Sequence, residues 1–175
     1  AYHIAKASSV NPWFVKAFEE GFFDEVLPNI RVINFIGGEP LVVDEHYAWL
    51  EHIIEQGWSE NIELHYNTNA TTIPDRLLDI WDKFRGVVLS LSIDAVGDLA
   101  YYVRFPSKWR VIEKNMIKLN EFSKTRTAVK VQTHVTLSLL NIHDLPNVLN
   151  WCKHQYDTWN YEWDWGVHGY QNCLP

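Results

Sequence analysis

The stretch "INFIGGEPLVVDEHYAWLEHII", residues 33–54, decides the fold. An apolar, strand-like run ends at a short polar tip, and an amphipathic helical pattern follows. The tip consists of Gly37, Gly38, Glu39 and Pro40. Glycines let a ligand approach the backbone closely, a proline exposes the carbonyl before it, and a glutamate offers a carboxylate. The segment therefore predicts either a ligand site at the end of a strand or a plain strand-to-helix turn.

The same alternation of strand and helix continues along the chain. Apolar runs predict strands at residues 31–36, 62–66, 87–93, 129–137 and 161–167. Helical spacing between them predicts five apolar helix faces: Phe14, Phe18 and Phe22; Tyr47, Leu50 and Ile54; Leu77, Trp81 and Phe84; Ile112, Met116 and Leu119; Val148 and Cys152, after a cap at Asp144. Such alternation is typical of parallel strands joined by helical crossovers, in which ligands bind at the carboxyl ends of the strands.

One face of the predicted sheet is repeatedly polar. Ser90, Ser92 and Asp94 alternate with apolar residues in the third predicted strand, and Gln132 and His134 do so in the fourth. Leaving many such groups buried and unpaired would cost about 1–3 kcal/mol each. The pattern therefore predicts an open or partial barrel with a wet concave side. An antiparallel sheet with one face in water gives the same alternation and remains an alternative.

Composition narrows the class of protein. The 175 residues are most simply one domain over residues 1–175, and 47% apolar with 21% charged residues is globular. A net charge of −7 argues against a nucleic-acid surface, and no apolar run is long enough to span a membrane. The start of the chain lacks a secretory pattern, so we expect a cytoplasmic protein. Cys152 and Cys173 form no disulfide framework or zinc motif, and Cys152 is expected to be a buried thiol.

The order of the polar motifs resembles the radical S-adenosylmethionine (SAM) enzymes. After "GGEP" come "NTNAT" at residues 67–71, "SIDA" at residues 92–95, and Arg104 within "YYVRFPSKW". The resemblance covers nearly the whole chain and is closest to members with a twitch or SPASM extension. It implies an α/β fold, a partial (βα)6 TIM-like barrel of parallel strands. The strand at residues 31–36 would match the family's second strand, so the first is missing from this chain.

The resemblance also implies roles for individual residues. The amino group of SAM would be received by Gly37, Gly38, Glu39 and Pro40. Asn67 and Asn69 would line the barrel interior, Ser92 and Asp94 would face the ribose and carboxylate of SAM, and Arg104 would pair with that carboxylate. Residues 167–170, "VHGY", would lie near the adenine, and His134 would face the substrate.

Each of these residues also has an ordinary structural interpretation. Asp94 could cap a helix, and Arg104 could be a solvated surface charge. Asn67 and Asn69 could form an Asx turn. His134 could be a hydrogen-bonded interior histidine. The tryptophans at positions 151, 159, 163 and 165 are expected to pack in the core or at its edge rather than to form a stacking platform.

The chain departs from the family in its cysteines. The family binds a [4Fe–4S] cluster through a C-x3-C-x2-C loop after its first strand, and no such triplet exists here. We expect that loop and strand to lie upstream of Ala1; the alternative is a degenerate member that has lost them. Either account leaves the chain alone inactive and a sheet edge exposed to self-association. The intact parent would cleave SAM reductively to a 5′-deoxyadenosyl radical and abstract a substrate hydrogen. Its partners would be an electron donor and a substrate, with a peptide or protein as our hypothesis.

Two other functions remain open from the sequence. A metal-dependent barrel hydrolase could use Glu39, His65, Asp94 and His134 at the strand ends, because these residue types suit zinc or manganese. A non-catalytic module could use the same pocket to bind SAM or another nucleotide, or to dock a partner.

Overall fold

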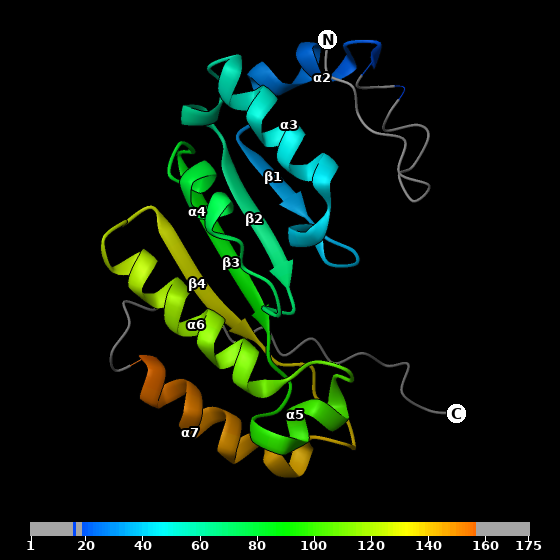
Figure 1. The fold of residues 1–175 in the computed structure, drawn as a ribbon, viewed down its shortest axis with the longest axis vertical. Coiled ribbons are helices and arrows are strands. Elements are labelled where there is room, and N and C mark those ends of the chain that lie inside the picture. The colour runs from blue at the N-terminus through cyan, green and yellow to red at the C-terminus, as the bar shows by residue number, and fades with distance from the viewer. Residues whose placement is uncertain (1–15, 17–18, 157–175) are drawn as a thin grey trace.

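The computed structural model describes residue 16 and residues 19–156, which form an α/β structure around a four-stranded sheet (Figure 1). The strands are β1 (Val32–Phe35), β2 (Glu63–Thr68), β3 (Gly86–Ser92) and β4 (Val129–His134), in the order β1-β2-β3-β4. All three strand pairs are parallel, so the antiparallel alternative is wrong. Within the described residues the sheet is open, with β1 and β4 at its edges.

Helices alternate with the strands as the sequence predicts. They are α2 (Phe22–Val26), α3 (Asp44–Glu55), α4 (Asp75–Trp81), α5 (Gly97–Val103), α6 (Trp109–Lys124) and α7 (Leu145–Tyr156). Short 3₁₀ turns occur at Leu27–Asn29, Pro40–Val42, Ser59–Asn61 and Ile142–Asp144. In Figure 1, α3, α4 and α6 cover the same side of the sheet. The opposite face of the strands, which carries their polar side chains, is not covered by these three helices (Figure 1).

A single apolar core lies between the sheet and these helices. Strand side chains that point toward the helices are almost fully buried, among them Leu64, Tyr66, Leu89, Leu91, Val129 and Val131. The predicted helix faces meet them through Leu50, Leu77, Trp81, Ile112, Met116 and Leu119. The predicted division into an apolar and a polar face is confirmed for β2, β3 and β4. At about 25 cal/mol per Å² of apolar surface, this burial is the main stabilising contribution.

The polar face of the strands is only partly covered. Asn67 and Lys130 are exposed, His65, Ser92, Gln132 and His134 are half-buried, and Ser90 is buried. Gln132 Nε2 donates to Ser90 Oγ at 2.7 Å and lies 3.2 Å from His134 Nε2. This row satisfies neighbouring polar groups across β3 and β4, which are paired in register at Ser90 and Gln132.

Some predicted boundaries are wrong. The fourth strand ends at His134 rather than at residue 137, because the Thr136 N–H bonds to the Asp94 carboxylate. Asp144 does precede α7, and Cys152 within α7 is buried as expected. The predicted strand at residues 161–167, most of the first predicted helix, and residues 167–170 lie outside the described residues.

One of the four tryptophans expected to be packing residues lies at a contact between two helices. Trp151 of α7 packs edge-to-face against Trp109 of α6, with ring centroids 4.9 Å apart, as expected for a packing residue. The other three tryptophans of that group lie outside the described residues. Among residue 16 and residues 19–156, no helix combines the length and the apolar character needed to cross a membrane.

Candidate functional site

The carboxyl ends of the four strands gather the predicted polar motifs at one edge of the sheet. Because the strands are parallel and adjacent, the segments that follow them leave the sheet on the same side. Glu39 follows β1, Asn69 follows β2, Asp94 follows β3 and Thr136 follows β4. The candidate site is built from these four connections.

Glu39 ties the first connection to the second. Its Oε1 accepts a hydrogen bond from the Thr68 hydroxyl at 2.7 Å, and its Oε2 accepts one from the Asn69 N–H at 2.8 Å. The same carboxylate caps the 3₁₀ turn Pro40–Val42 by accepting from the Leu41 N–H at 3.4 Å. A carboxylate has about four lone-pair sites, so roughly one acceptor position is left for a ligand.

The two glycines before Glu39 differ in backbone conformation. Gly37 has a φ of +112°, which side-chain-bearing residues rarely adopt, whereas Gly38 has no such constraint. A Cβ at either position would meet no atom within 4 Å. Both backbones therefore face open space, and Pro40 starts the 3₁₀ turn that follows.

The two asparagines of "NTNAT" have different environments. Asn69 Oδ1 accepts from the Thr71 N–H at 2.9 Å and from the Thr71 hydroxyl at 2.6 Å, so it forms the Asx turn considered from the sequence. Its amide Nδ2 is left as a donor. Asn67 lies within β2 on the polar face, is exposed, and pairs in register with Ser90 of β3.

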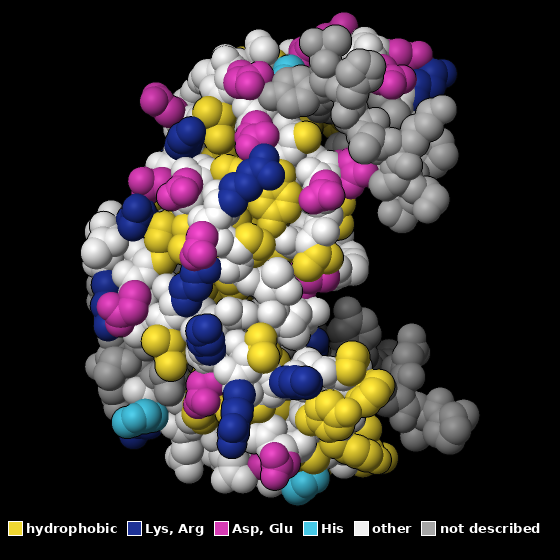
Figure 2. Space-filling view, in the orientation of Figure 1, with side chains coloured by type: hydrophobic (Ala, Val, Ile, Leu, Met, Phe, Trp, Pro, Cys, Tyr) yellow, Lys and Arg dark blue, Asp and Glu magenta, His cyan; other side chains and the backbone are white. Residues whose placement is uncertain are grey.

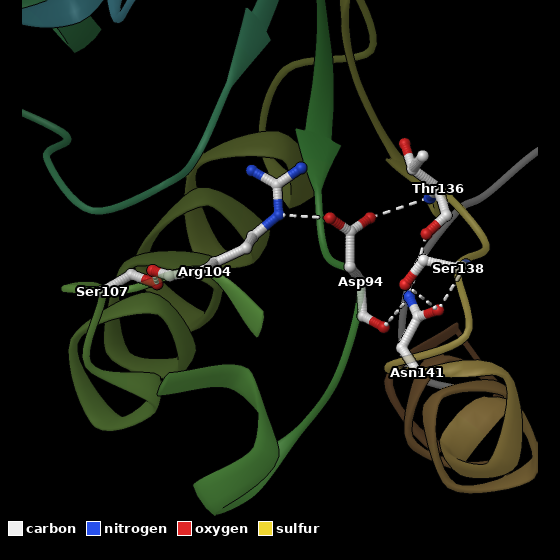
Figure 3. Close-up of polar contacts among 6 residues, drawn as sticks. All are labelled: Asp94, Arg104, Ser107, Thr136, Ser138 and Asn141. Atoms are coloured by element: carbon white, nitrogen blue, oxygen red, sulfur yellow. Dashed lines mark hydrogen bonds and ion pairs between the residues drawn. The ribbon is translucent and has the colours of Figure 1, made fainter. Parts of the chain in front are cut away.

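Asp94 and Arg104 form the charged centre of the site (Figure 3). Arg104 Nε donates to Asp94 Oδ2 at 2.6 Å, and the Thr136 N–H donates to Asp94 Oδ1 at 2.7 Å. Asp94 is 8% exposed. The cap of α5 is Val96, so Asp94 is not a helix cap, and Arg104 is not a solvated surface charge. The carboxylate instead joins the ends of β3 and β4 to the segment between α5 and α6.

Asn141 holds the other side of this centre. Its Nδ2 donates to the carbonyls of Asp94 at 2.8 Å and Thr136 at 2.9 Å, and its Oδ1 accepts from the Ser138 N–H at 2.7 Å. Figure 3 shows these bonds on the side of Asp94 opposite Arg104. On the other flank, the Ser107 hydroxyl donates to the Arg104 carbonyl. Both residues of the ion pair therefore have fixed backbones.

A cavity of about 560 Å³ opens beside Arg104. Asn69 and Thr71 line it from the connection after β2, and residues 104–108 and Val111 line it from the α5–α6 segment. Asn69 thus borders both Glu39, through its N–H, and the cavity. A continuous series of contacts links Glu39 to Asn69, the cavity, Arg104 and Asp94.

Ser92 and His134 lie near this edge but make no contact with that series in the described bonds. They pair in register at the ends of β3 and β4, and both are half-buried. His134 Nε2 lies 3.2 Å from Gln132 Nε2, which fits the interpretation of a hydrogen-bonded interior histidine.

The four side chains of the hydrolase alternative have separate partners. Glu39 binds Thr68 and Asp94 binds Arg104. His65 Nε2 lies 2.6 Å from Glu63 Oε1, and His134 lies against Gln132. In the part of the chain that the structure describes, no three His, Cys, Asp or Glu side chains come together as a metal site.

Three residues that support the site were not predicted from the sequence. Thr68 is 2% exposed and lies on the apolar face of β2. Strand alternation predicts that face, so this signal could have identified Thr68 as a buried polar residue near the end of β1. Asn141 lies in a loop with no pattern that connects it to Asp94. Lys108 belongs to the quoted motif around Arg104, and its position in the cavity lining follows only from the fold of the α5–α6 segment.

A comparison of the chain with protein-family models finds no match, and neither does a comparison with curated proteins. The fold itself defines the class of the described residues: an open parallel α/β sheet with a polar, partly charged site at its carboxyl edge.

Proposed function

We propose that this chain is the larger part of a radical SAM core domain and that SAM binds along the carboxyl edge of its sheet. The strands β1 to β4 would correspond to strands two to five of a partial (βα)6 barrel. The support for this proposal is the contact series from Glu39 through Asn69 and the cavity to Arg104 and Asp94. It connects the motifs of the resemblance along one edge of the sheet.

The chemistry of these residues fits the parts of SAM. Glu39 keeps about one acceptor position, and the Gly37 and Gly38 backbones face open space, so the ammonium group could be received there. Asp94 uses one bond on each oxygen and keeps about two acceptor positions for ribose hydroxyls. The two terminal nitrogens of Arg104 suit a carboxylate.

The chain's own residues do not fit a [4Fe–4S] cluster. Such a cluster needs thiolate ligands, and the family uses three. The sequence holds two cysteines, of which Cys152 is 4% exposed within α7. The proposal for this chain is therefore SAM binding. Reductive SAM cleavage and hydrogen abstraction are proposed for the intact parent, where the cluster supplies the electron.

Isothermal titration calorimetry of the purified chain with SAM tests this function. We expect measurable binding that Asp94→Asn weakens about tenfold, as for the loss of one charge-assisted hydrogen bond. Asp98→Asn is the matched control, because Asp98 is exposed in the first turn of α5. Absence of SAM binding by the unaltered chain would overturn the proposal.

A second experiment separates an enzyme from a binding module. The chain extended upstream by its coding region is reconstituted anaerobically with iron and sulfide. A broad visible charge-transfer absorption supports the radical SAM parent. SAM binding without that absorption in the extended protein favours the non-catalytic module.

A further inference from the structure

The cavity beside Arg104 contains more binding groups than SAM would use. Phe105, Ser107 and Lys108 have no role in the SAM assignment, yet all three line it. Its volume of about 560 Å³ lies within the range of small-molecule sites. These lining residues determine what kind of ligand the cavity can hold.

The charged and amide side chains of the lining, Arg104, Lys108 and Asn69, present donors. Arg104 bonds to Asp94 through Nε alone, and Figure 3 shows its two terminal nitrogens turned away from Asp94. Within the described residues, neither those nitrogens nor Lys108 Nζ has a bonding partner. Asn69 Oδ1 is occupied by Thr71, which leaves its Nδ2 donor.

The hydroxyl hydrogens of the lining are already used within the protein. The Thr71 hydroxyl donates to Asn69 Oδ1, and the Ser107 hydroxyl donates to the Arg104 carbonyl. No carboxylate lines the cavity. Two acids bond to lining residues: Asp94 directs its two oxygens to Arg104 and Thr136, and Glu39 accepts from the Asn69 N–H. Two cations and an amide donor therefore surround a space in which a negative group is favoured.

An exposed aromatic ring stands at the same opening. Phe105 is 71% exposed, lines the cavity with Pro106 and Val111, and meets Tyr101 edge-to-face with ring centroids 5.3 Å apart. Tyr101 and Tyr102 are also exposed, and Figure 2 shows hydrophobic side chains gathered over α5. A flat apolar group could stack on such a ring.

We propose that this cavity binds a phosphate monoester carried on a flat ring, as in a nucleoside monophosphate. The phosphate lies between the two terminal nitrogens of Arg104 and Lys108 Nζ, which match its three non-ester oxygens in number. The ring lies against Phe105. This site overlaps the proposed SAM site at Arg104 and Asn69, so the two ligands would compete, and it needs neither SAM nor a cluster.

Calorimetric titration with adenosine monophosphate tests the proposal. We expect it to bind about tenfold tighter than adenosine or inorganic phosphate, because each lacks one of the two recognised groups. Equal binding of adenosine, or no binding of the monophosphate, overturns the proposal. Tighter binding of adenosine 5′-carboxylic acid overturns the choice of phosphate.

Two surface variants locate the ligand. Lys108→Ala should weaken binding about fivefold and Phe105→Ala about tenfold, while the thermal unfolding midpoint stays near that of the unaltered chain. The controls are Lys114→Ala on α6 and Leu139→Ala, which is 84% exposed; neither residue lines the cavity, and both should leave binding unchanged. Arg104 belongs to both proposed sites, so a variant at this position could not distinguish them and none is made. If Asp94→Asn weakens the monophosphate and Lys108→Ala does not, the ligand lies at the SAM site and this proposal fails, whereas the SAM proposal stands.

Discussion

Arg104 Nε lies 2.6 Å from Asp94 Oδ2, and this ion pair joins the end of β3 to the segment between α5 and α6. The Asp94 side chain is 10% exposed and that of Arg104 is 30% exposed, so water screens the pair only in part. The pair also holds one wall of the cavity, because Arg104 lines it. Its loss should therefore affect both stability and ligand binding.

Asp94→Asn should lower the free energy of unfolding by about 2 kcal/mol. That value lies below the 3–5 kcal/mol typical of breaking a fully buried pair, because Arg104 keeps some access to water. Urea unfolding measures the change. Asp98→Asn, an exposed carboxylate nearby, should change stability by less than about 0.5 kcal/mol. Equal effects of the two variants would show that the ion pair contributes nothing specific.

Gly37→Ala should report on backbone strain, and Gly38→Ala should report on how closely SAM approaches the backbone. Gly37 has a φ of +112°, so alanine there should cost about 1–3 kcal/mol of stability, whereas Gly38→Ala should be nearly neutral. Thermal unfolding measures both changes. If SAM approaches this backbone, Gly38→Ala should weaken SAM binding without loss of stability. Unchanged SAM affinity in a stable Gly38→Ala protein would contradict the proposed position of the amino group.

Glu39→Gln should destabilise the connection between β1 and β2 by about 1–2 kcal/mol. Glutamine keeps one acceptor oxygen, so either the Thr68 hydroxyl or the Asn69 N–H loses its acceptor and meets an NH₂ group. Chemical denaturation measures the loss, with Glu55→Gln at the exposed end of α3 as the control. A neutral Glu39→Gln would mean that water replaces the missing acceptor at no cost.

The sequence predicts the strand ends and their polar motifs because strand alternation and parallel topology follow from local patterns. Asp94, Asn69 and Glu39 could thus be expected at one edge of the sheet, and the structure places them there. The partners that fix them could not be predicted. Thr68 reaches Glu39 across 29 positions, and Asn141 reaches Asp94 across 47, and each contact depends on the three-dimensional course of the connections.

The end of β4 shows the same limit. Residues 135–137 continue the alternating pattern of a strand, but the Thr136 N–H bonds to Asp94 Oδ1 and leaves the strand ladder. A charge-assisted bond to a half-satisfied carboxylate replaces a ladder bond there. Periodicity contains no information about that competition, so the predicted strand is too long.

A buried histidine should make stability depend on pH. His46 of α3 is 6% exposed, its Nε2 lies 2.8 Å from the Tyr66 hydroxyl, and burial lowers its pKa from 6.5 to about 4. Burial also raises the pKa of Tyr66, so the tyrosine stays neutral throughout this range. Between these two values the unfolded chain takes up a proton that the folded chain does not. The contribution of His46 is therefore fully present above pH 6.5 and is lost as the pH falls to about 4.

The size of this loss should be about 3 kcal/mol, since each pKa unit corresponds to about 1.4 kcal/mol. Other groups titrate in the same range, so the measurement compares the free energy of unfolding of the unaltered chain with that of His46→Gln at pH 7 and pH 4.5. Glutamine does not titrate and can still bond to Tyr66, so the variant should lose less stability on acidification. His143→Gln, an exposed histidine beyond β4, should follow the unaltered chain. Parallel pH profiles for His46→Gln and the unaltered chain would show that His46 takes up its proton as readily in the folded state as in the unfolded one.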